Sequence, residues 1–309
     1  MRPVHVDVAY SPLYLSWQLG EGHPTDPRRA QLAVNLLAEL CPTHELVSGR
    51  WELDEVVEIA EMVHDRKYVR SVLLEGRSSE WEGRRPDLGR AAATMFAGTV
   101  VLMHRLCERD WTPGVSFNPQ GAKHHAARAS SSGFCVLNDH AWAAAYALAL
   151  GKRVAVLDWD VHHGDGTEVM LWHTDAVTLS IHQSGIFPGT GRRHHTDAGV
   201  YNYPLLRGVG DSALLGCVKA ALEVLDLRGG VDVLLLAAGA DGLGVDPLGG
   251  LEYSLPGLYQ AAGVVGEWCA LRGVPVVVGG AGGYTPLRET PMAWAGVVRC
   301  LVDAYQKVA

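Results

Sequence analysis

Acids and imidazoles crowd one short segment of the sequence, residues 153–168, which reads RVAVLDWDVHHGDGTE. It opens with residues 154–157, a short apolar run rich in valine that predicts a buried strand. If the extended conformation continues past this run, Asp158, Asp160 and His162 project to one side of the strand. Side chains of these types can bind a metal ion or move protons.

Charged groups at the end of a buried strand need compensation, and a divalent metal ion would provide it. Aspartate and histidine are both zinc ligands, and the turn at residues 164–166 is where a strand of an α/β protein would lead into a helix. The competing interpretation is that the acids cap helices and that neighbouring groups satisfy the histidines. Five polar residues within positions 158–165 favour the metal site.

The chain has 309 residues, enough for one large α/β domain or two ordinary ones, and a hydrophobic content of 48% supports a substantial core. Its formal net charge of −8 argues against nucleic acid or an anionic membrane as the main partner. Apolar runs fall short of the roughly 18 residues that span a bilayer, and the first ten residues lack a signal-peptide core. Six dispersed cysteines without a CxxC motif are typical of reduced thiols. We therefore expect a soluble, cytoplasmic protein, and its oligomeric state stays open.

Strands and helices alternate along the chain without internal repeats. This predicts one doubly wound α/β domain over residues 1–309, with a largely parallel central sheet flanked by helices. Apolar or alternating runs predict strands at residues 4–9, 115–118, 154–157, 176–182, 231–238 and 275–278. Helical patterns cover residues 30–40, 53–74, 91–107 and 133–150, with Asp26 as N-cap of the first helix and Pro27 at its first position.

Polar residues follow several of the predicted strands and would meet at one edge of the sheet. His124 and His125 come after strand 115–118, and a helix then returns the chain to the central strand. Because the carboxyl ends of parallel strands share an edge, this βαβ unit brings both histidines beside Asp158. Asp241 follows strand 231–238, and Tyr284 follows the last strand through a glycine-rich turn.

Three of these side chains meet the needs of a catalytic metal, which takes three protein ligands and keeps one position open for water. The predicted ligands are Asp160, His162 and Asp241. Two carboxylates make the site rich in oxygen, so we expect zinc, with Fe²⁺ or Co²⁺ as ions that could take its place. A bound metal would lower the pKa of its water and polarise a substrate carbonyl.

The remaining groups suit proton transfer. His124 and His125 can exchange protons near neutral pH, and a carboxylate on the second ring nitrogen holds a histidine in one tautomer. Asp158 and Asp165 are the candidate carboxylates, and the Tyr284 hydroxyl can donate to a developing oxyanion. Together these parts predict metal-assisted hydrolysis of an amide or a related acyl bond.

Between His23 and Tyr284, the motifs and their order resemble the zinc-dependent histone deacetylase family. That family includes acetoin-utilisation proteins and acetylpolyamine amidohydrolases, and it shares the arginase-like fold. The block at residues 158–166 is specific by itself, and the other motifs gain specificity as a set. The motifs are HPxxPxR at residues 23–29, His124-His125, Gly133-Phe134-Cys135, DxDxHHGDG at residues 158–166, FPGTG at residues 187–191, Gly239-Ala240-Asp241 and Gly282-Gly283-Tyr284.

The resemblance implies a role for each matched residue. Zinc would be bound by Asp160, His162 and Asp241. The further implied roles are general base and acid for His125 with Asp165, electrostatic partner for His124 with Asp158, and polarisation of the acyl carbonyl for Tyr284.

The resemblance also implies a narrow tunnel for an extended acyl-lysine stem, with Phe134 and Phe187 as walls and Gly133 in the lining. Core packing is the competing interpretation for both phenylalanines. Arg29 matches an arginine of an inner channel for the acetate product, and its competing interpretation is a charge on a helix surface. The resemblance further implies a structural K⁺ near the catalytic strand, and we expect it to be bound through Asp158, Asp160, His162, Ser180 and Ile181.

Two departures from the family pattern bear on the substrate. Protein deacetylases of the family often carry an aspartate on a rim loop, and within the polar stretch at residues 75–90 only Asp87 is a candidate. That stretch, which carries Trp81, is either a rim over the binding site or a mobile insertion. Leu248 stands where the animal polyamine-selective branch carries glutamate, which favours an acyl-lysine substrate.

Our first hypothesis is a lysine deacetylase acting on acetylated protein, and the second is a hydrolase of acetylpolyamines or other small acetylated amines. A binuclear manganese ureohydrolase is disfavoured, because Leu243 stands where such enzymes carry a second aspartate. A catalytically silent acyl-lysine binding module is the alternative outside enzymes. It predicts the loss of a metal ligand or of Tyr284, and all of these residues are present.

Overall fold

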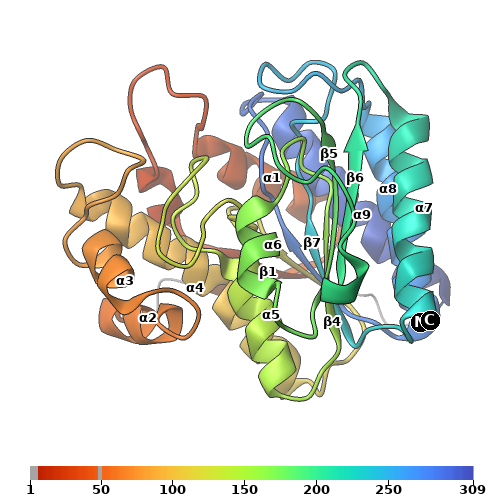
Figure 1. Cartoon of the computed structure of the whole chain (residues 1–309), viewed down its shortest axis with the longest axis horizontal. Helices are drawn as coiled ribbons and strands as arrows, with labels where there is room; N and C mark the ends of the chain where they lie inside the picture. Colours follow the sequence, from red (N-terminus) through yellow and green to blue (C-terminus); the bar gives the residue numbers. More distant parts are fainter. Residues whose placement is uncertain (1–5, 48–50, 309) are drawn as a thin grey trace.

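The computed structural model describes residues 6–47 and 51–308, which form a central sheet with helices packed on both faces (Figure 1). The strands are β1 (Val6–Tyr10), β2 (Thr43–Val47), β3 (Val115–Asn118), β4 (Val154–Asp158), β5 (Val177–Gln183), β6 (Val200–Leu205), β7 (Val233–Ala237) and β8 (Val276–Gly279). The α-helices are α1 (Arg28–Leu40), α2 (Leu53–Ala60), α3 (Arg66–Leu73), α4 (Pro86–Glu108), α5 (Asp139–Ala149), α6 (Asp165–Leu171), α7 (Asp211–Leu227), α8 (Leu255–Arg272) and α9 (Glu289–Val308).

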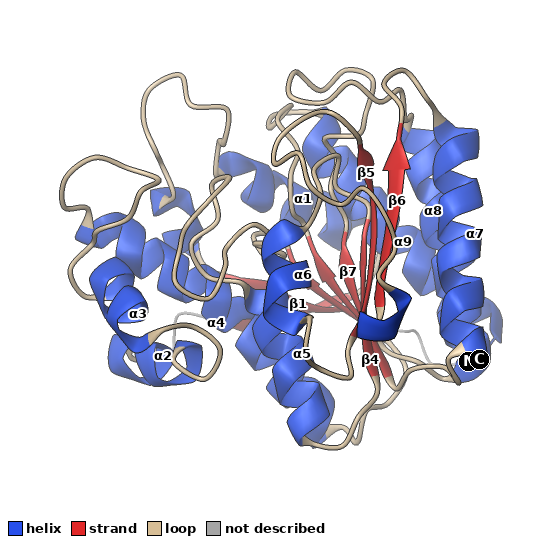
Figure 2. Cartoon of the chain, in the orientation of Figure 1, coloured by secondary structure: helices blue, strands red, loops and turns tan. Residues whose placement is uncertain are grey.

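The eight strands lie in the order β2-β1-β3-β8-β7-β4-β5-β6, and every neighbouring pair is parallel. Helices α4 and α5 pack on one face, and α1, α9 and α7 contact the sheet from the other, with α8 packed between α7 and α9. In Figure 2, the strands run between α5 and α6 on one side and α7 and α8 on the other. The predicted α/β class with a parallel central sheet is confirmed.

The central strands place the functional loops. All residues of β4, β7 and β8 are buried, as expected for parallel strands covered on both faces. β4 and β7 are neighbours, and Asp158 is the register partner of Ala237. The loops that follow these two strands therefore leave the same edge of the sheet side by side, and they carry the predicted metal ligands.

The predicted strands are confirmed to within two residues at their described ends. Residues 4 and 5 of the first predicted strand lie outside the described residues. The strands at the two edges of the sheet, β2 and β6, were not predicted from the sequence. Edge strands are partly exposed and mix polar with apolar residues, so they lack a clear apolar run. Pro204 lies within β6, a position that an edge strand tolerates.

Two helix predictions were too long. Residues 53–74 form α2 and α3 instead of one helix, because the Asp65 side chain accepts the backbone N–H groups of Lys67 and Tyr68 and starts a new helix. The helix predicted from residue 133 begins only at Asp139. Its N-cap is Asn138, whose side chain accepts the Ala141 N–H at 2.9 Å.

Two other helix boundaries also differ from prediction. Pro27, and not Asp26, occupies the N-cap position of α1, while the Asp26 carboxylate accepts the Arg28 N–H at 2.9 Å. Helix α4 begins at Pro86, so the polar stretch predicted to reach residue 90 ends at residue 85. No helix in the described ranges is long and apolar enough to cross a membrane.

Candidate active site

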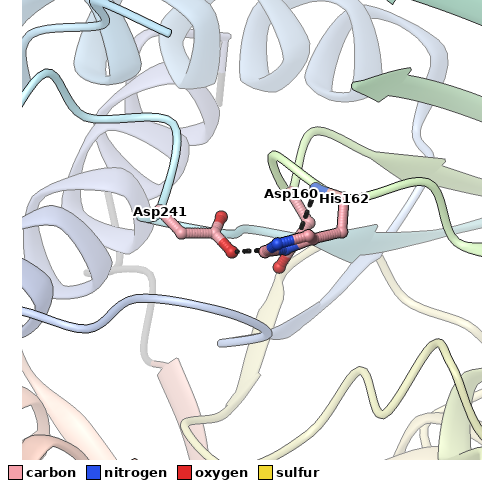
Figure 3. A group of neighbouring side chains, drawn as sticks. All are labelled: Asp160, His162 and Asp241. Atoms are coloured by element: carbon pink, nitrogen blue, oxygen red, sulfur yellow. Dashed lines mark hydrogen bonds and ion pairs between the residues drawn. The ribbon is translucent and has the colours of Figure 1, made fainter. Parts of the chain in front are cut away.

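Asp160 and His162 follow β4, Asp241 follows β7, and their side chains converge (Figure 3). Both carboxylates are buried and the imidazole is 11% exposed. His162 Nδ1 lies 3.1 Å from Asp160 Oδ1 and 3.2 Å from Asp241 Oδ2. One nitrogen and two oxygens of this triad lie within 4.8 Å of one another, and within residues 6–47 and 51–308 this is the only such group of three. The predicted ligands thus come together in the arrangement of a metal site.

Backbone donors hold the two carboxylates in place. Asp160 Oδ2 accepts the Gly282 N–H at 2.6 Å, and Asp241 Oδ1 accepts the Val161 N–H at 2.9 Å. A Cβ atom at Gly282 would lie 2.0 Å from Asp241 Oδ2, so this close backbone approach requires glycine. The ligand orientations are therefore fixed by the fold before any ion binds.

The electrostatics of the triad favour a cation. Burial raises the pKa of Asp241 to about 7, and the Asp160 charge acts in the same direction. Burial alone would lower the pKa of His162, but its hydrogen bonds to Asp160 and Asp241 raise it to about 10. The two buried carboxylates thus stabilise a proton on His162, which lies between them, and a divalent ion bound there would be stabilised in the same way.

Two histidine–aspartate pairs flank the triad. His124 Nδ1 lies 2.7 Å from Asp158 Oδ2, and His125 Nδ1 lies 2.6 Å from Asp165 Oδ1. The two imidazole centroids are 4.0 Å apart. His124 Nε2 also lies 3.7 Å from Asp160 Oδ1. The structure thus brings together both pairs that the sequence predicted.

The two histidines differ in charge. Burial alone would lower the pKa of His124, but the Asp158 and Asp160 charges raise it to about 9. Burial lowers the pKa of His125 to about 4, and the His124 charge acts in the same direction although Asp165 opposes it. At neutral pH, these pKa values leave the His125 ring neutral and the His124 ring protonated.

A cavity of about 430 Å³ opens above these groups. Its lining contains every residue predicted for the tunnel, together with His125, His162 and Tyr284. The lining residues are His125, Gly133, Phe134, His162, Ile186, Phe187, Leu248 and Tyr284. Burial raises the pKa of Tyr284 well above its usual value, so its hydroxyl keeps its proton and can donate. The phenylalanines line a cavity and do not fill the core, and Phe187 is 49% exposed.

Gly133 is required where it stands. Its backbone is left-handed (φ +54°), and a Cβ atom there would lie 2.4 Å from His125 Cδ2 and 3.0 Å from the Phe187 ring. A larger residue would therefore push into the His125 imidazole and narrow the cavity.

The loop that ends at residue 85 contributes no residue to the lining of this cavity but contacts one residue of that lining. Trp81 is buried, donates to the Gly76 carbonyl at 2.9 Å and packs edge-on against Trp17. The Glu80 carboxylate accepts the Phe134 N–H at 2.6 Å, so the loop contacts a wall of the cavity. Asp87 does not line the cavity: it pairs with Arg85 in the exposed first turn of α4.

Arg29 is buried, so its interpretation as a helix-surface charge is wrong. Its Nη1 donates to the Gly283 carbonyl at 2.6 Å, next to Tyr284. Sequence analysis missed Lys123, which is also buried and whose pKa burial lowers to about 8, with a further contribution from the Arg29 charge. Its position before His124 was the available signal, but lysine is usually exposed.

Comparison with known proteins identifies the family. The histone deacetylase domain model matches residues 23–301. The chain belongs to the histone deacetylase family. It is 30% identical over 95% of its length to the acetoin utilization protein AcuC of Staphylococcus aureus strain MRSA252, covering 81% of that protein. It is also 30% identical to AcuC of Bacillus subtilis strain 168, over 93% of this chain and 80% of that protein. The identity to histone deacetylase 6 of Arabidopsis thaliana is 30% as well, over 95% of this chain and 65% of that protein.

A crystal structure of the HDA15 HD domain has the same fold. It superposes with a TM-score of 0.79 at 23% identity and covers 97% of this chain and 90% of that one. The protein is therefore a hydrolase of the histone deacetylase family, and its Asp160–His162–Asp241 triad forms a metal site.

Proposed function

We propose that this hydrolase uses zinc to remove acetyl, or related acyl, groups from lysine side chains of proteins. The observation that carries the proposal is the cavity whose mostly apolar lining combines Phe134 and Phe187 with His125, His162 and Tyr284. A narrow apolar passage accommodates the methylene stem of lysine, while the polar groups at its inner end meet the amide.

The residues present fit zinc, because one imidazole nitrogen and two carboxylate oxygens are a suitable set of three ligands. Bound there, zinc would polarise the acyl carbonyl and acidify a water molecule. Fe²⁺ or Co²⁺ also suits these ligands. A structural K⁺ stays a prediction, and the pairing of Asp158 with Ser180 on adjacent strands is compatible with it.

In the proposed reaction, neutral His125 accepts the proton of the attacking water and then delivers it to the lysine nitrogen that leaves. Asp165 fixes its tautomer through Nδ1. Protonated His124, held by Asp158, adds positive charge beside the developing oxyanion. The Tyr284 hydroxyl donates to the same oxygen. Products are a carboxylate and a free lysine amine.

The charge of the cavity lining favours acyl-lysine over acetylpolyamine. Among the lining residues, all of which lie in the described part of the chain, no side chain is acidic. Leu248 contributes an apolar surface at the rim and is 38% exposed. A polycationic substrate gains affinity from acidic groups near the entrance, whereas a neutral acylated side chain does not need them. We further propose that residues 1–309 act as one catalytic domain.

The test is hydrolysis of an acetyl-lysine peptide beside acetylated putrescine and acetylated spermidine, with zinc-loaded protein. We expect faster turnover of the peptide, with a loss of about 100-fold in kcat for Tyr284→Phe because one oxyanion donor is removed. Turnover of the acetylpolyamines alone would assign the enzyme to small amines. No metal-dependent turnover of any of the three would contradict the proposed reaction.

A further inference from the structure

The Phe134 wall has an unusual backbone. Gly133 and Phe134 are both left-handed, with φ of +54° and +64°. Glycine adopts this conformation freely, whereas a bulky side chain such as that of Phe134 is disfavoured there. The surrounding structure must therefore hold Phe134 in place.

Glu80 provides the contact that fixes this backbone. Its Oε2 accepts the Phe134 N–H at 2.6 Å, across 54 positions of sequence. The acceptor is a half-buried carboxylate, and a hydrogen bond from a backbone N–H to a charged acceptor is stronger than one between neutral groups. On its other side, Phe134 is flanked by the His23 ring, with centroids 4.5 Å apart.

Glu80 is itself held by a fixed loop. On the residues before it, the Ser78 and Ser79 hydroxyls donate to Ser131, at 2.7 Å to its Oγ and 3.3 Å to its carbonyl. On the residue after it, Trp81 is buried. The loop thus contacts the wall segment at both Ser131 and Phe134, and Glu80 lies between its two anchoring points.

The opposite wall has no comparable support from this loop. Phe187 is 49% exposed and contacts the His125 ring at 4.9 Å. The width of the passage therefore depends on where the backbone of Phe134 is held.

We propose that Glu80 is a positioning residue that sets the Phe134 wall and thereby the fit of the substrate stem. The inference rests on the proposed function only in naming an extended acyl-lysine stem as what the passage holds. Glu80 does not touch the reacting atoms. His125, Tyr284 and the metal ligands are held by other contacts, so loss of Glu80 weakens substrate binding more than it slows the chemical step.

The experiment compares Glu80→Ala and Glu80→Gln with Glu82→Ala in zinc-loaded protein. Glu82 is exposed on the same loop, so its replacement makes the same change in charge without touching the wall. For an acetyl-lysine peptide, we expect Glu80→Ala to raise KM about tenfold while kcat changes less than about twofold, as for loss of one charge-assisted hydrogen bond. Glu80→Gln keeps an oxygen acceptor and should restore most of the affinity, and Glu82→Ala should behave like the wild type.

Amide hydrogen exchange in the peptide covering residues 130–137 measures the hydrogen bond between the Phe134 N–H and Glu80 without any substrate. We expect faster exchange in Glu80→Ala and wild-type exchange in Glu82→Ala. A loss of kcat and thermal stability at unchanged KM would show a merely structural role and overturn the proposal, as would unchanged exchange.

Failure of the proposed function leaves a distinct pattern. If the wild type hydrolyses no acetyl-lysine peptide, calorimetric titration of that peptide replaces KM. A tenfold weaker affinity in Glu80→Ala then supports the positioning role, and equal affinity in the two proteins overturns it.

Discussion

His124 and His125 are neighbours in the chain, and each presents Nδ1 to an aspartate, at 2.7 Å from Asp158 and 2.6 Å from Asp165. Their pKa values nevertheless move in opposite directions, to about 9 and about 4. The Asp158 side chain is 5% exposed and that of Asp165 is 28% exposed. His124 also has Asp160 Oδ1 at 3.7 Å from its second nitrogen.

The difference between the two pairs comes from their surroundings and not from their chemistry. Two buried carboxylates attract the proton of His124, and their attraction exceeds the cost of burying the charged ring. On His125, burial and the charge of His124 outweigh the partly solvated Asp165 and the smaller contribution of Asp160. The proposed reaction uses this difference, with the neutral ring as base and the protonated ring as cation, as catalytic pairs of like residues do when their environments differ.

Replacing the base should have the largest effect. His125→Ala removes the group that takes the water proton, and we expect kcat to fall by about 1000-fold. Steady-state kinetics on an acetyl-lysine peptide measures this loss. Bound zinc, quantified in both proteins, is the control, because His125 is not one of the predicted ligands. A loss of tenfold or less with zinc retained would mean that another group is the base.

Removing the carboxylate charge beside His124 should cause the second largest loss of activity. Asp158→Asn deletes the main source of its raised pKa, so His124 loses its proton at lower pH. In the proposed reaction the charged form of His124 is the active one, and this form is present below its pKa. We therefore expect the alkaline limb of kcat/KM to move from about pH 9 toward neutrality, with about 100-fold less activity at pH 8 as one oxyanion-stabilising charge is lost. An unmoved alkaline limb would show that His124 does not act through its charge.

The same substitution in the other pair, Asp165→Asn, should lower activity less. His125 is already neutral at pH 7 with Asp165 present, so Asp165→Asn does not change its charge there. It removes the acceptor that fixes the tautomer, and we expect about a tenfold lower kcat without a shift of the alkaline limb. Loss as large as that of His125→Ala would show that Asp165 itself takes part in proton transfer.

In the wild type, pH should have the smallest effect across the neutral range. The pKa of His125 is depressed, so its neutral form is present above about pH 4, and the pKa of His124 is raised, so its charged form is present below about pH 9. Asp160 and Asp241 would balance the charge of the dication proposed to bind there. We expect kcat/KM to vary less than about twofold between pH 6 and 7.5. A steep rise through pH 6.5 would indicate an unperturbed histidine base.

The sequence could predict the part of the site that depends on strand ends. Apolar runs marked β4 and β7, and parallel pairing then places Asp160 and Asp241 at one edge whatever the details of the loops. The resemblance to the family supplied the pairing of His124 and His125 with their aspartates. These contacts follow from topology and from motifs that lie close together in the chain.

Other features depend on contacts that no local pattern records. The bond between Glu80 and Phe134 joins positions 54 apart, and burial of Lys123 contradicts the usual exposure of lysine. The late start of α5 depends on the Asn138 side chain, whereas residues 133–137 have a composition that a helix would also accept. In each case, tertiary contacts outweigh the local preference.

The most direct test of the central claim, that adjacent histidines divide the roles of base and cation, is an NMR titration of the histidine rings in zinc-loaded protein. The resonances would be assigned with His124→Gln and His125→Gln. We expect that at pH 7 the His124 ring is protonated and the His125 ring is neutral, with a hydrogen on Nδ1 facing Asp165. Protonated His125 at pH 7, or titration of His125 above His124, would contradict the account.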